Sequence, residues 1–304
     1  MLNHLTRRTL LAAIPAATAG FVLSDATRSR AAALGLPVGV QLYSVRDLLP
    51  HDFAGTLKQI AAIGYKEVEA AGYYNHSAND VKAALEAAGL RCPSAHYSYQ
   101  ALAAGFDSIV DFNSKVGVHT IICSFPGFKD PARVKGLAPG SMLKAFNMDD
   151  WHWNAEQFNK FGKRAKDAGM AFGYHNHIME FHSDNGVTGL DALIRNTDPD
   201  LVTFELDCGW VVVGGGNPVD YLKRYSSRIS MLHVKDFRKA TQPASLEHPP
   251  QAAELGTGTI DYHPIFAAAK EGHITHLFVE QEEFNMPPMQ SLRIDYNYVN
   301  DFAA

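Results

Sequence analysis

Short apolar runs alternate with amphipathic stretches along the chain from residue 38 onward. The apolar runs are predicted to be buried strands because they are continuous and only a few residues long. The amphipathic stretches have the period of a helix, and several stop at a glycine. The predicted strands are residues 38–43, 67–69, 91–96, 119–123, 171–177, 201–207, 229–235 and 276–281. The predicted helices are residues 52–63, 78–88, 106–116, 149–168, 189–196, 218–225 and 261–271.

Eight strands in strict alternation with helices predict a parallel sheet that helices cover on the outside. Eight such units favour a closed (β/α)8 barrel, the α/β fold of TIM barrels, over an open sheet. No linker is visible, so residues 34–304 are expected to form one barrel domain. Asp149 or Asp150 is expected to cap the helix that reaches Ala168.

Two long stretches, residues 125–147 and 236–260, are predicted to be loops. Both leave the carboxyl end of a strand, where a barrel of this kind carries its active site and builds the walls around it. Glycine-rich segments at residues 214–216 and 255–258 are interpreted as turns, with anion binding by their backbone N–H groups as the alternative.

The first 33 residues have the pattern of an export signal. Arg7 and Arg8 precede an Ala-rich, weakly apolar segment that extends to about Leu23, and small residues follow up to Ala33. This order predicts a cleavable twin-arginine signal over residues 1–33 and a mature protein in the periplasm. The apolar segment is too short to be a permanent membrane span, so no membrane association is expected after cleavage.

The composition is that of a globular protein, with 46% hydrophobic and 19% charged residues. The formal charge is −5, and removal of residues 1–33, which hold four arginines and one aspartate, changes it to −8. With this charge and no basic tract, a nucleic-acid partner is not expected. The three cysteines, Cys92, Cys123 and Cys208, are widely spaced and are predicted to be buried free thiols.

Polar side chains gather where the predicted strands end. A carboxylate or an imidazole is costly in an apolar core unless it meets a partner such as a cation. The carboxyl ends of the strands in a parallel barrel point to one region, so these groups are expected to converge there. The groups at strand ends are Glu69, His96, His175, His177, Asp207, His233, Lys235 and Glu280. Their convergence predicts a metal site with proton-transfer groups beside it.

The contribution of the strand at 171–177 has two interpretations. If His175 ends the strand facing inward, it is a direct ligand. If the chain folds back over the barrel mouth, Glu180 is the ligand, and His175 and His177 handle protons or substrate hydroxyls. We favour Glu180. At the last strand Glu282 shares a face with Glu280 and is the alternative there.

Aromatic residues crowd the same end of the predicted barrel and offer apolar faces to the C–H groups of a sugar. For many of them, packing of the barrel is the simpler interpretation. The aromatic residues are Tyr43, Tyr73, Tyr74, Tyr97, Tyr99, Phe125, Phe128, Trp151, Trp153 and Trp210. We assign substrate binding to Tyr43, Glu69, His96 and Trp210.

Several motifs together resemble the xylose isomerase-like sugar isomerase/epimerase family, in particular an exported branch with a YHNH-x-x-EF strand. These motifs are VGVQLYSVRD (38–47), IGYKEVE (63–69), YHNHIMEF (174–181), FELDCGW (204–210), HVKDF (233–237), ELGTGTIDY (254–262) and FVEQE (278–282). The resemblance implies one divalent cation, Mn, Mg, Zn or Co, bound by Glu180, Asp207, His233 and Glu280. This chain departs from many members of the family by carrying His175 at the end of the fifth strand.

The resemblance also implies proton transfer beside a carbonyl, through an enediolate. Glu180 and Glu280 are then the acid–base pair, with His175 or His177 as substitutes and Lys235 beside the negative oxygen. The leading hypothesis is an isomerase or epimerase of a small sugar or keto-sugar, possible as a homo-oligomer. A lyase or hydrolase of 3-keto-glycosides and a non-catalytic sugar-binding barrel are the alternatives. No cluster of Arg and Lys is evident, so a phosphorylated substrate is not expected.

Overall fold

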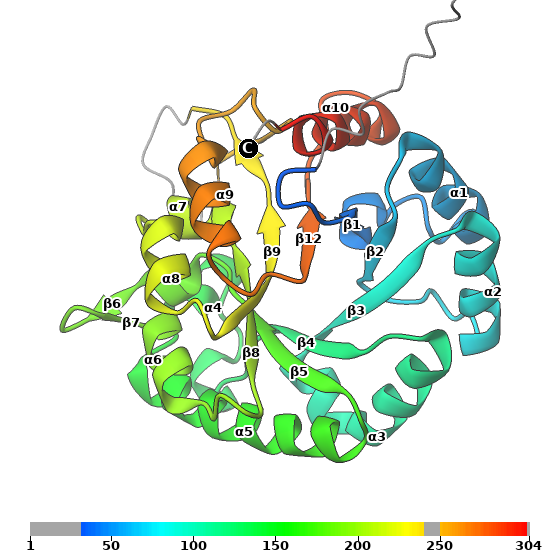
Figure 1. The fold of residues 1–304 in the computed structure, drawn as a ribbon. Coiled ribbons are helices and arrows are strands. Elements are labelled where there is room, and N and C mark those ends of the chain that lie inside the picture. The colour runs from blue at the N-terminus through cyan, green and yellow to red at the C-terminus, as the bar shows by residue number, and fades with distance from the viewer. Residues whose placement is uncertain (1–31, 240–249, 303–304) are drawn as a thin grey trace, which may run out of the picture.

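The computed structural model describes residues 32–239 and 250–302. Eight parallel strands close into a barrel in the order β1-β2-β3-β4-β5-β8-β9-β12, with β12 paired back to β1. Helices surround the barrel on the outside (Figure 1). This confirms the predicted (β/α)8 fold. The predicted export signal lies outside the described residues, apart from its last two positions.

The structure gives the bounds of each element. The barrel strands are β1 (Val38–Gln41), β2 (Glu67–Ala70), β3 (Arg91–Ser98), β4 (Thr120–Phe125), β5 (Ala171–His175), β8 (Thr203–Asp207), β9 (Ile229–Val234) and β12 (His276–Val279). The α-helices are α1 (Phe53–Ile63), α2 (Ala78–Ala88), α3 (Tyr99–Val116), α4 (Pro139–Lys144), α5 (Met148–Asp167), α6 (Gly189–Asn196), α7 (Cys208–Val213), α8 (Pro218–Arg224), α9 (Tyr262–Lys270) and α10 (Pro288–Asn300). Short pairs β6–β7 (Ser183–Asp184, Val187–Thr188) and β10–β11 (Asp236–Phe237, Ala252–Ala253) and 3-10 turns η1 (Leu42–Val45), η2 (Pro131–Val134) and η3 (Met179–Phe181) complete the described chain.

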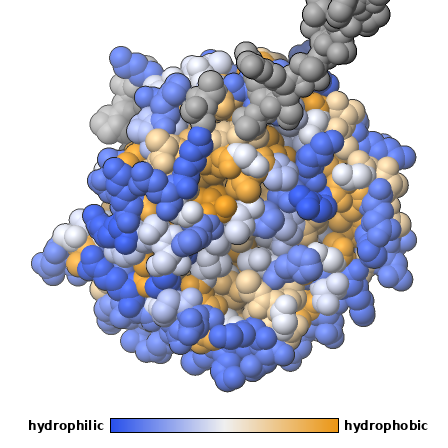
Figure 2. Space-filling view, in the orientation of Figure 1, coloured by the Kyte–Doolittle hydropathy of each residue, from blue (hydrophilic) through white to orange (hydrophobic). Residues whose placement is uncertain are grey.

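Local signals set the bounds of the first two helices. The side chain of Asp52 accepts a hydrogen bond from the backbone N–H of Gly55 and so caps α1, which ends at Gly64. The side chain of Ser77 caps α2 in the same way, and Gly89 ends that helix with a left-handed backbone. Outer helix faces are polar, and Figure 2 shows hydrophilic side chains around most of the periphery. None of the helices among the described residues is both long and apolar enough to cross a membrane.

Four details of the secondary structure differ from expectation. Asn147, rather than Asp149 or Asp150, caps α5, because its side chain accepts the N–H of Asp150 while the Asp150 carboxylate accepts the N–H of Asn147. The helix α3 begins seven residues before its predicted start and carries a non-helical residue at Gly105. The stretch 125–147 contains η2 and α4. The sequence pattern predicts neither α7 nor α10.

An apolar layer fills the middle of the barrel. Ile122, Met231 and Phe278 contact one another there and are at most 2% exposed. Met231 and Phe278 lie two residues before His233 and Glu280, so the alternation of side chains along a strand places them on the same inward face, one layer deeper. Polar groups at the carboxyl end of the barrel are therefore separated from the opposite end by hydrocarbon.

The glycine-rich loop after β9 is built around one carboxylate. Asp236 accepts hydrogen bonds from the backbone N–H groups of residues 237, 256, 258, 259 and 260 at 2.9–3.2 Å. A Cβ at Gly258 would lie 2.2 Å from the Asp236 carboxylate, so that position requires glycine. The N–H groups of this turn thus bind an anion that belongs to the protein itself, which agrees with its interpretation as a turn.

The same loop meets a second buried carboxylate, and this contact predicts how stability changes with pH. Asp295 on α10 accepts the N–H of Leu255 at 2.7 Å, and burial raises its pKa to about 7. A folded-state pKa above that of the unfolded chain stabilises the fold at low pH, and this contribution is lost as the pH rises toward 7. Asp295→Asn keeps an acceptor for Leu255. We expect it to remove this pH-dependent contribution, on the order of 3 kcal/mol, from the difference in unfolding free energy between pH 4 and pH 8.

Urea unfolding at several pH values measures this effect. Asp301→Asn, at the exposed end of the same helix, is the control and should keep the pH profile of the wild type. If Asp295→Asn has the same dependence of unfolding free energy on pH as the wild type, the Asp295 carboxyl has the same pKa in the folded and the unfolded chain.

Candidate metal centre and active site

Inward-facing side chains of four neighbouring strands meet at the carboxyl end of the barrel. In β8 the alternation places Glu205 and Asp207 on the inner face, while Phe204 and Leu206 pack in the layer between strands and helices. On β9 the same alternation turns His233 inward. Because parallel strands end at the same edge, these groups lie within contact distance, as the sequence predicts.

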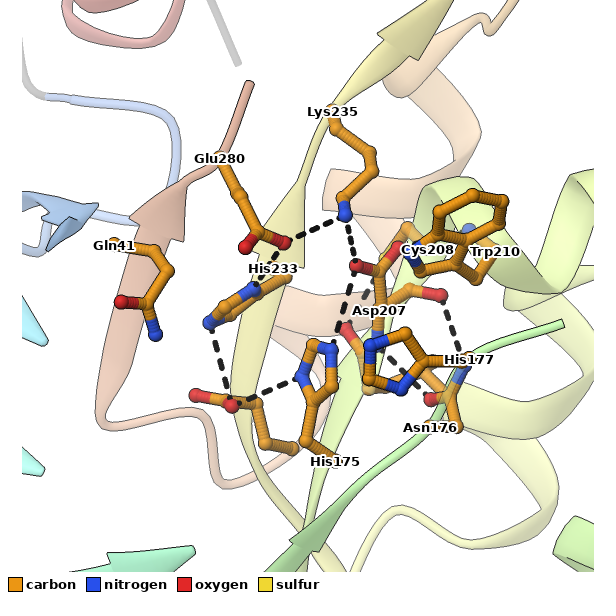
Figure 3. A network of polar contacts seen from close by, with 12 residues as sticks. Gln41, His175, Asn176, His177, Asp207, Cys208, Trp210, His233, Lys235 and Glu280 are labelled. Carbon is orange, nitrogen blue, oxygen red and sulfur yellow. Dashed lines mark hydrogen bonds and ion pairs between the residues drawn. The ribbon is translucent and has the colours of Figure 1, made fainter. Parts of the chain in front are cut away.

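We use the name outer cluster for His175, Asp207, His233 and Glu280. One ligand atom of each residue lies within 4.8 Å of all the others, and all four residues are buried. Nδ1 of His233 is 3.2 Å from Oε2 of Glu280, and Nε2 of His175 is 3.8 Å from Oδ2 of Asp207 (Figure 3). Three of the four predicted metal ligands are therefore together here, and His175 is the fourth member.

Lys235 lies across the mouth of the outer cluster. Its Nζ is 2.6 Å from Oε2 of Glu280, 3.0 Å from Oδ2 of Asp207 and 2.7 Å from Oε1 of Glu282. Figure 3 shows the amine between the carboxylates of Asp207 and Glu280. Burial alone lowers the pKa of Lys235, but the three carboxylates outweigh it and hold the pKa well above its usual range. Lys235 is thus a permanent positive charge at the rim of the site.

We use the name inner cluster for Glu69, His96 and Glu205, which lie one layer deeper. Oε2 of Glu69 is 2.6 Å from Nε2 of His233 and 2.9 Å from Nε2 of His96. Oε2 of Glu205 is 2.7 Å from Nε2 of His96 and 3.1 Å from Nδ1 of His175. His175 and His233 of the outer cluster therefore also contact the carboxylates of the inner cluster, and they lie between the two clusters.

The pKa values show how charge is distributed over the two clusters. Burial lowers the pKa of His96, but Glu69 and Glu205 outweigh this effect and raise it to about 9. Burial and Glu69 raise the pKa of Glu205, yet His233 and His96 bring it down to about 2. Burial raises the pKa of Asp207 to about 6, against the opposing effect of Lys235. The inner carboxylates are therefore ionised at neutral pH and balanced by imidazolium.

The structure places Glu180 away from the outer cluster. Its carboxylate accepts a short hydrogen bond from the hydroxyl of Tyr174 and another, at 3.0 Å, from the N–H of His177. Tyr174 faces the helix layer, where its ring stacks on Phe158 of α5 at 5.0 Å between centroids. Glu180 follows it to that side of the strand, and burial raises its pKa to about 7. Of the two interpretations of this segment, the geometry favours His175 as the group that faces the cluster.

Residues 176 and 177 turn the chain beyond the end of β5. The side chain of Asn176 binds both backbone groups of Asp207, with Asp207 N–H donating at 3.0 Å and the Asn176 amide donating to the Asp207 carbonyl at 3.3 Å. This contact fixes the end of β8. His177 lines the cavity described below, and its Nδ1 is buried without a hydrogen-bond partner among the described residues. Burial and Lys235 lower the pKa of His177 to about 3, so its imidazole is neutral at physiological pH.

A cavity of about 330 Å³ opens above the outer cluster. Its lining residues are Tyr43, Ala71, His96, Tyr97, Ser98, Ser124, Phe125, His175, His177, Glu280 and Glu282. Among the residues assigned to substrate binding, Tyr43 and His96 therefore lie in its wall.

The two other residues assigned to substrate binding lie elsewhere. Glu69 is buried in the inner cluster, beneath the cavity. Trp210 lies below Lys235, whose Nζ is 5.0 Å from the centre of the indole ring, and it lines a smaller adjoining cavity. Trp151 stacks on Phe146 at 4.8 Å, so packing is the correct interpretation for this ring.

A second cavity, of about 350 Å³, lies at the opposite end of the barrel. Its buried carboxylate, Glu67, already binds His276 and Arg91 at 2.8 Å each. The apolar layer inside the barrel separates this cavity from the two clusters.

The donor set of the outer cluster fits a divalent cation. Two imidazole nitrogens and two carboxylate oxygens are ligands that Zn and Mn accept, and more oxygen-rich surroundings would be needed for Ca. Lys235 alone offsets three carboxylates here, those of Asp207, Glu280 and Glu282, so the outer cluster can accommodate further positive charge. His175, Asp207, His233 and Glu280 are therefore the residues that would hold the metal.

Residues 57–298 match the protein family described as the xylose isomerase-like TIM barrel. The chain belongs to this family. The match spans most of the described barrel and confirms the resemblance seen in the sequence motifs. The fold and the enzyme character of the family thus apply to this chain, while the reaction and the substrate require a separate argument.

Relatives within and around the family carry several activities. The inosose dehydratase of Lacticaseibacillus casei is 29% identical over 256 residues, which cover 76% of this chain and 82% of that protein. A crystal structure from Parabacteroides distasonis ATCC 8503, described as a sugar phosphate isomerase/epimerase, is 26% identical with a TM-score of 0.68 and covers 87% of this chain and 94% of its own. The crystal structure of an IOLI protein with a bound zinc atom has a TM-score of 0.64 at 12% identity, over 86% of this chain and 96% of its own, and shows similarity of fold.

Sequence reasoning missed Glu205. The residue stands in FELD, a strand for which the sequence pattern predicts only the terminal acid, Asp207, as a site residue. The signal was present, because Glu205 is two residues before Asp207 and must share its inward face. With Glu205, the barrel interior contains three carboxylates on β2 and β8 that contact the two histidines His175 and His233. They belong to Glu69, Glu205 and Asp207.

Proposed function

We propose that the chain is a divalent-metal-dependent enzyme acting beside the carbonyl of a keto-sugar or keto-cyclitol. It removes the proton from the carbon next to the carbonyl and then expels the oxygen substituent on the following carbon. The outer cluster, with the Lys235 ammonium 2.6 Å from Glu280 at its rim, is the observation that carries this proposal. A bound cation would supply positive charge for the oxygen that becomes negative when the proton leaves.

His177 is the group best placed to move the proton. Its ring lines the cavity and is neutral at physiological pH. Its buried Nδ1 has no hydrogen-bond partner among the described residues. In the first step the C–H bond breaks and the proton passes to His177, while the electron pair moves toward the carbonyl oxygen. In the second step the C–O bond on the next carbon breaks, and the leaving oxygen takes the proton from His177. Lys235 stabilises the negative oxygen between the two steps.

The relatives support elimination as the outcome. The inosose dehydratase of L. casei is named for loss of water from a keto-cyclitol. In the proposed mechanism His177 alone moves the proton. This agrees with the position of Glu180, which binds Tyr174 and does not line the cavity, so the β5 side offers no carboxylate as a second proton-transfer group. The IOLI structure, which is described as carrying a bound zinc atom, shares the fold of this chain and supports a metal in it.

Epimerisation is the second candidate. Glu280 and Glu282 line the cavity from the β12 side, and His177 lines it from the β5 side, so groups are present on two sides of a bound ring. The description of the P. distasonis structure as an isomerase/epimerase supports this alternative.

The substrate we propose carries no phosphate group. None of the residues that line the cavity of about 330 Å³ is an arginine or a lysine, whereas two are glutamates. Lys235 lines the adjoining cavity and is already surrounded by three carboxylates, so it offers far less positive charge than a phosphate group requires. Tyr43 and Phe125 supply aromatic faces for the C–H groups of a sugar ring. The Arg7–Arg8 pattern supports the further proposal that the enzyme works in the periplasm.

Metal removal and product analysis test this function. We expect a chelator to abolish turnover of an inosose or a 3-keto-glycoside, and added Mn²⁺ or Zn²⁺ to restore it. A substrate deuterated at the carbon next to the carbonyl should lose that deuterium on turnover, and either water or the aglycone should be released. Turnover by the metal-free protein would refute the proposal, and a diastereomer of the substrate as the only product would favour epimerisation.

A further inference from the structure

The two histidines shared by the clusters each use both ring nitrogens. His233 places Nδ1 3.2 Å from Glu280 in the outer cluster and Nε2 2.6 Å from Glu69 in the inner one. His175 places Nε2 3.8 Å from Asp207 and Nδ1 3.1 Å from Glu205. In both rings, therefore, the outer nitrogen faces a carboxylate of the proposed metal site, and the inner nitrogen faces a buried carboxylate that lies outside that site.

This arrangement decides which nitrogen carries the proton. A neutral imidazole has one N–H donor and one lone pair, and only the lone pair binds a metal. An ionised carboxylate accepts hydrogen bonds and donates none. A cation held by Asp207 and Glu280 would engage these two carboxylates, whereas Glu69 and Glu205 would still accept hydrogen bonds from the inner nitrogens, which therefore carry the hydrogens. The inner carboxylates thereby direct the lone pairs of His175 and His233 toward the outer cluster.

The inner carboxylates are themselves held in place. Oε2 of Glu69 also accepts a hydrogen bond from the Gln41 amide at 2.8 Å. His96 lies between the two carboxylates, with Nε2 2.9 Å from Glu69 and 2.7 Å from Glu205. Both glutamates are at most 1% exposed. A carboxylate that cannot move fixes the plane of the imidazole bound to it as well as its tautomer.

We propose that Glu69 and Glu205 are positioning residues of the metal centre. They hold the inner nitrogens of His233 and His175 as hydrogen-bond donors, so that Nδ1 of His233 and Nε2 of His175 are presented to a divalent cation. The inference rests on the proposed function, because it assumes that the outer cluster binds the cation. It assigns to Glu69 a role beneath the site in place of contact with substrate.

Metal affinity is the quantity that tests this role. Zn²⁺ and Mn²⁺ binding to the chelator-treated full-length protein is measured by calorimetry for the wild type, Glu205→Leu and Glu205→Gln. Loss of a carboxylate bound to a metal-ligating histidine lowers metal affinity by about 10–100-fold. We expect a loss of that size in Glu205→Leu. Glu205→Gln should show a smaller loss, because its amide oxygen still accepts the N–H of His175 but carries no charge.

Glu67→Gln is the matched control. Glu67 is a buried glutamate on β2 that also binds a histidine, with Oε2 2.8 Å from Nδ1 of His276, but it lies beyond the apolar layer. Its replacement should leave metal affinity unchanged. X-ray absorption of the zinc-loaded proteins gives a second readout that a purely structural role would not move: two imidazole ligands in the wild type and fewer in Glu205→Leu.

The possible results separate this inference from the proposed function. If the wild type binds no cation, the proposed function fails. If the wild type binds one cation and both Glu205 variants bind it equally tightly, the positioning role is refuted and the proposed function stands. Two cations in the wild type and one in Glu205→Leu would also refute it, as would a single cation with three imidazole ligands, because Glu205 would then be a ligand in the group of His96, His175, Glu205 and His233. If Glu205→Leu does not fold, the near-isosteric Glu205→Gln decides.

Discussion

Asp207→Asn is expected to abolish turnover and to weaken binding of a divalent cation by roughly 100-fold or more, which exceeds the usual effect of replacing a residue that only orients a metal ligand. Asp207 has two roles that this substitution separates. Its Oδ1 caps α7 by accepting the N–H of Trp210 at 2.8 Å, and its Oδ2 faces His175 and Lys235. Asparagine keeps an oxygen for the cap but removes the negative charge that a cation requires.

Calorimetric metal titration and a turnover assay check this result. The control is Asp52→Asn, at the aspartate that caps α1 on the outside of the barrel in the same way. It should bind metal as the wild type does. Full metal affinity in Asp207→Asn would remove Asp207 from the ligand set and with it the mechanism that we propose.

Lys235→Met is expected to destabilise the chelator-treated protein by about 3–5 kcal/mol. The methionine leaves Asp207 and Glu280 buried next to each other without the cation that now separates them. Because a bound divalent cation would also neutralise these carboxylates, added Zn²⁺ or Mn²⁺ should restore much of the lost stability. The loss of positive charge beside the carbonyl oxygen should still lower turnover of the metal-loaded variant.

Urea unfolding with and without metal measures both effects. Lys82→Met is the control, because Lys82 forms an exposed pair with Glu86 one helical turn away. Exposed pairs of this kind contribute at most about 0.5 kcal/mol, so the control should change little. Equal destabilisation of Lys235→Met in the presence and absence of metal would show that the cation does not replace this charge.

The parts of the fold that were predictable depend on neighbouring residues. Asp52 and Gly64 bound α1 because a cap and a left-handed stop act within a few positions. The helix α10 escaped prediction because its N-cap is Pro287, which offers no side-chain hydrogen bond to mark the start. Its position against the barrel is set by distant contacts, such as the hydroxyl of Tyr65 donating to the carbonyl of Leu292 at 2.8 Å.

The site shows the same limit. Asp207, His233 and Glu280 could be placed from the alternation along their strands. Glu180 could not, because its direction depends on Tyr174, whose hydroxyl binds it on the far side of β5. The sequence shows a carboxylate three residues beyond a strand end but contains no local mark of the turn that carries it outward. His175 therefore replaces it in the cluster by geometry that only the folded chain defines.

Closure of the barrel between its first and last strands has a consequence for synthesis. Val38, Gly39 and Val40 pair with Leu277, Phe278 and Val279, so β1 has no partner on one side until nearly the whole chain has left the ribosome. A nascent chain that stops before β12 exposes two open strand edges, which invite aggregation and proteolysis. The first described residues lie beside the last helix, α10, with the N–H of Ala33 bound to the carbonyl of Val299 at 3.0 Å. If residues 1–33 direct the export of folded protein, the strand that follows the signal, β1, is fully paired only after the last strand, β12, has been made. A truncated chain would then carry the signal on an unfolded barrel.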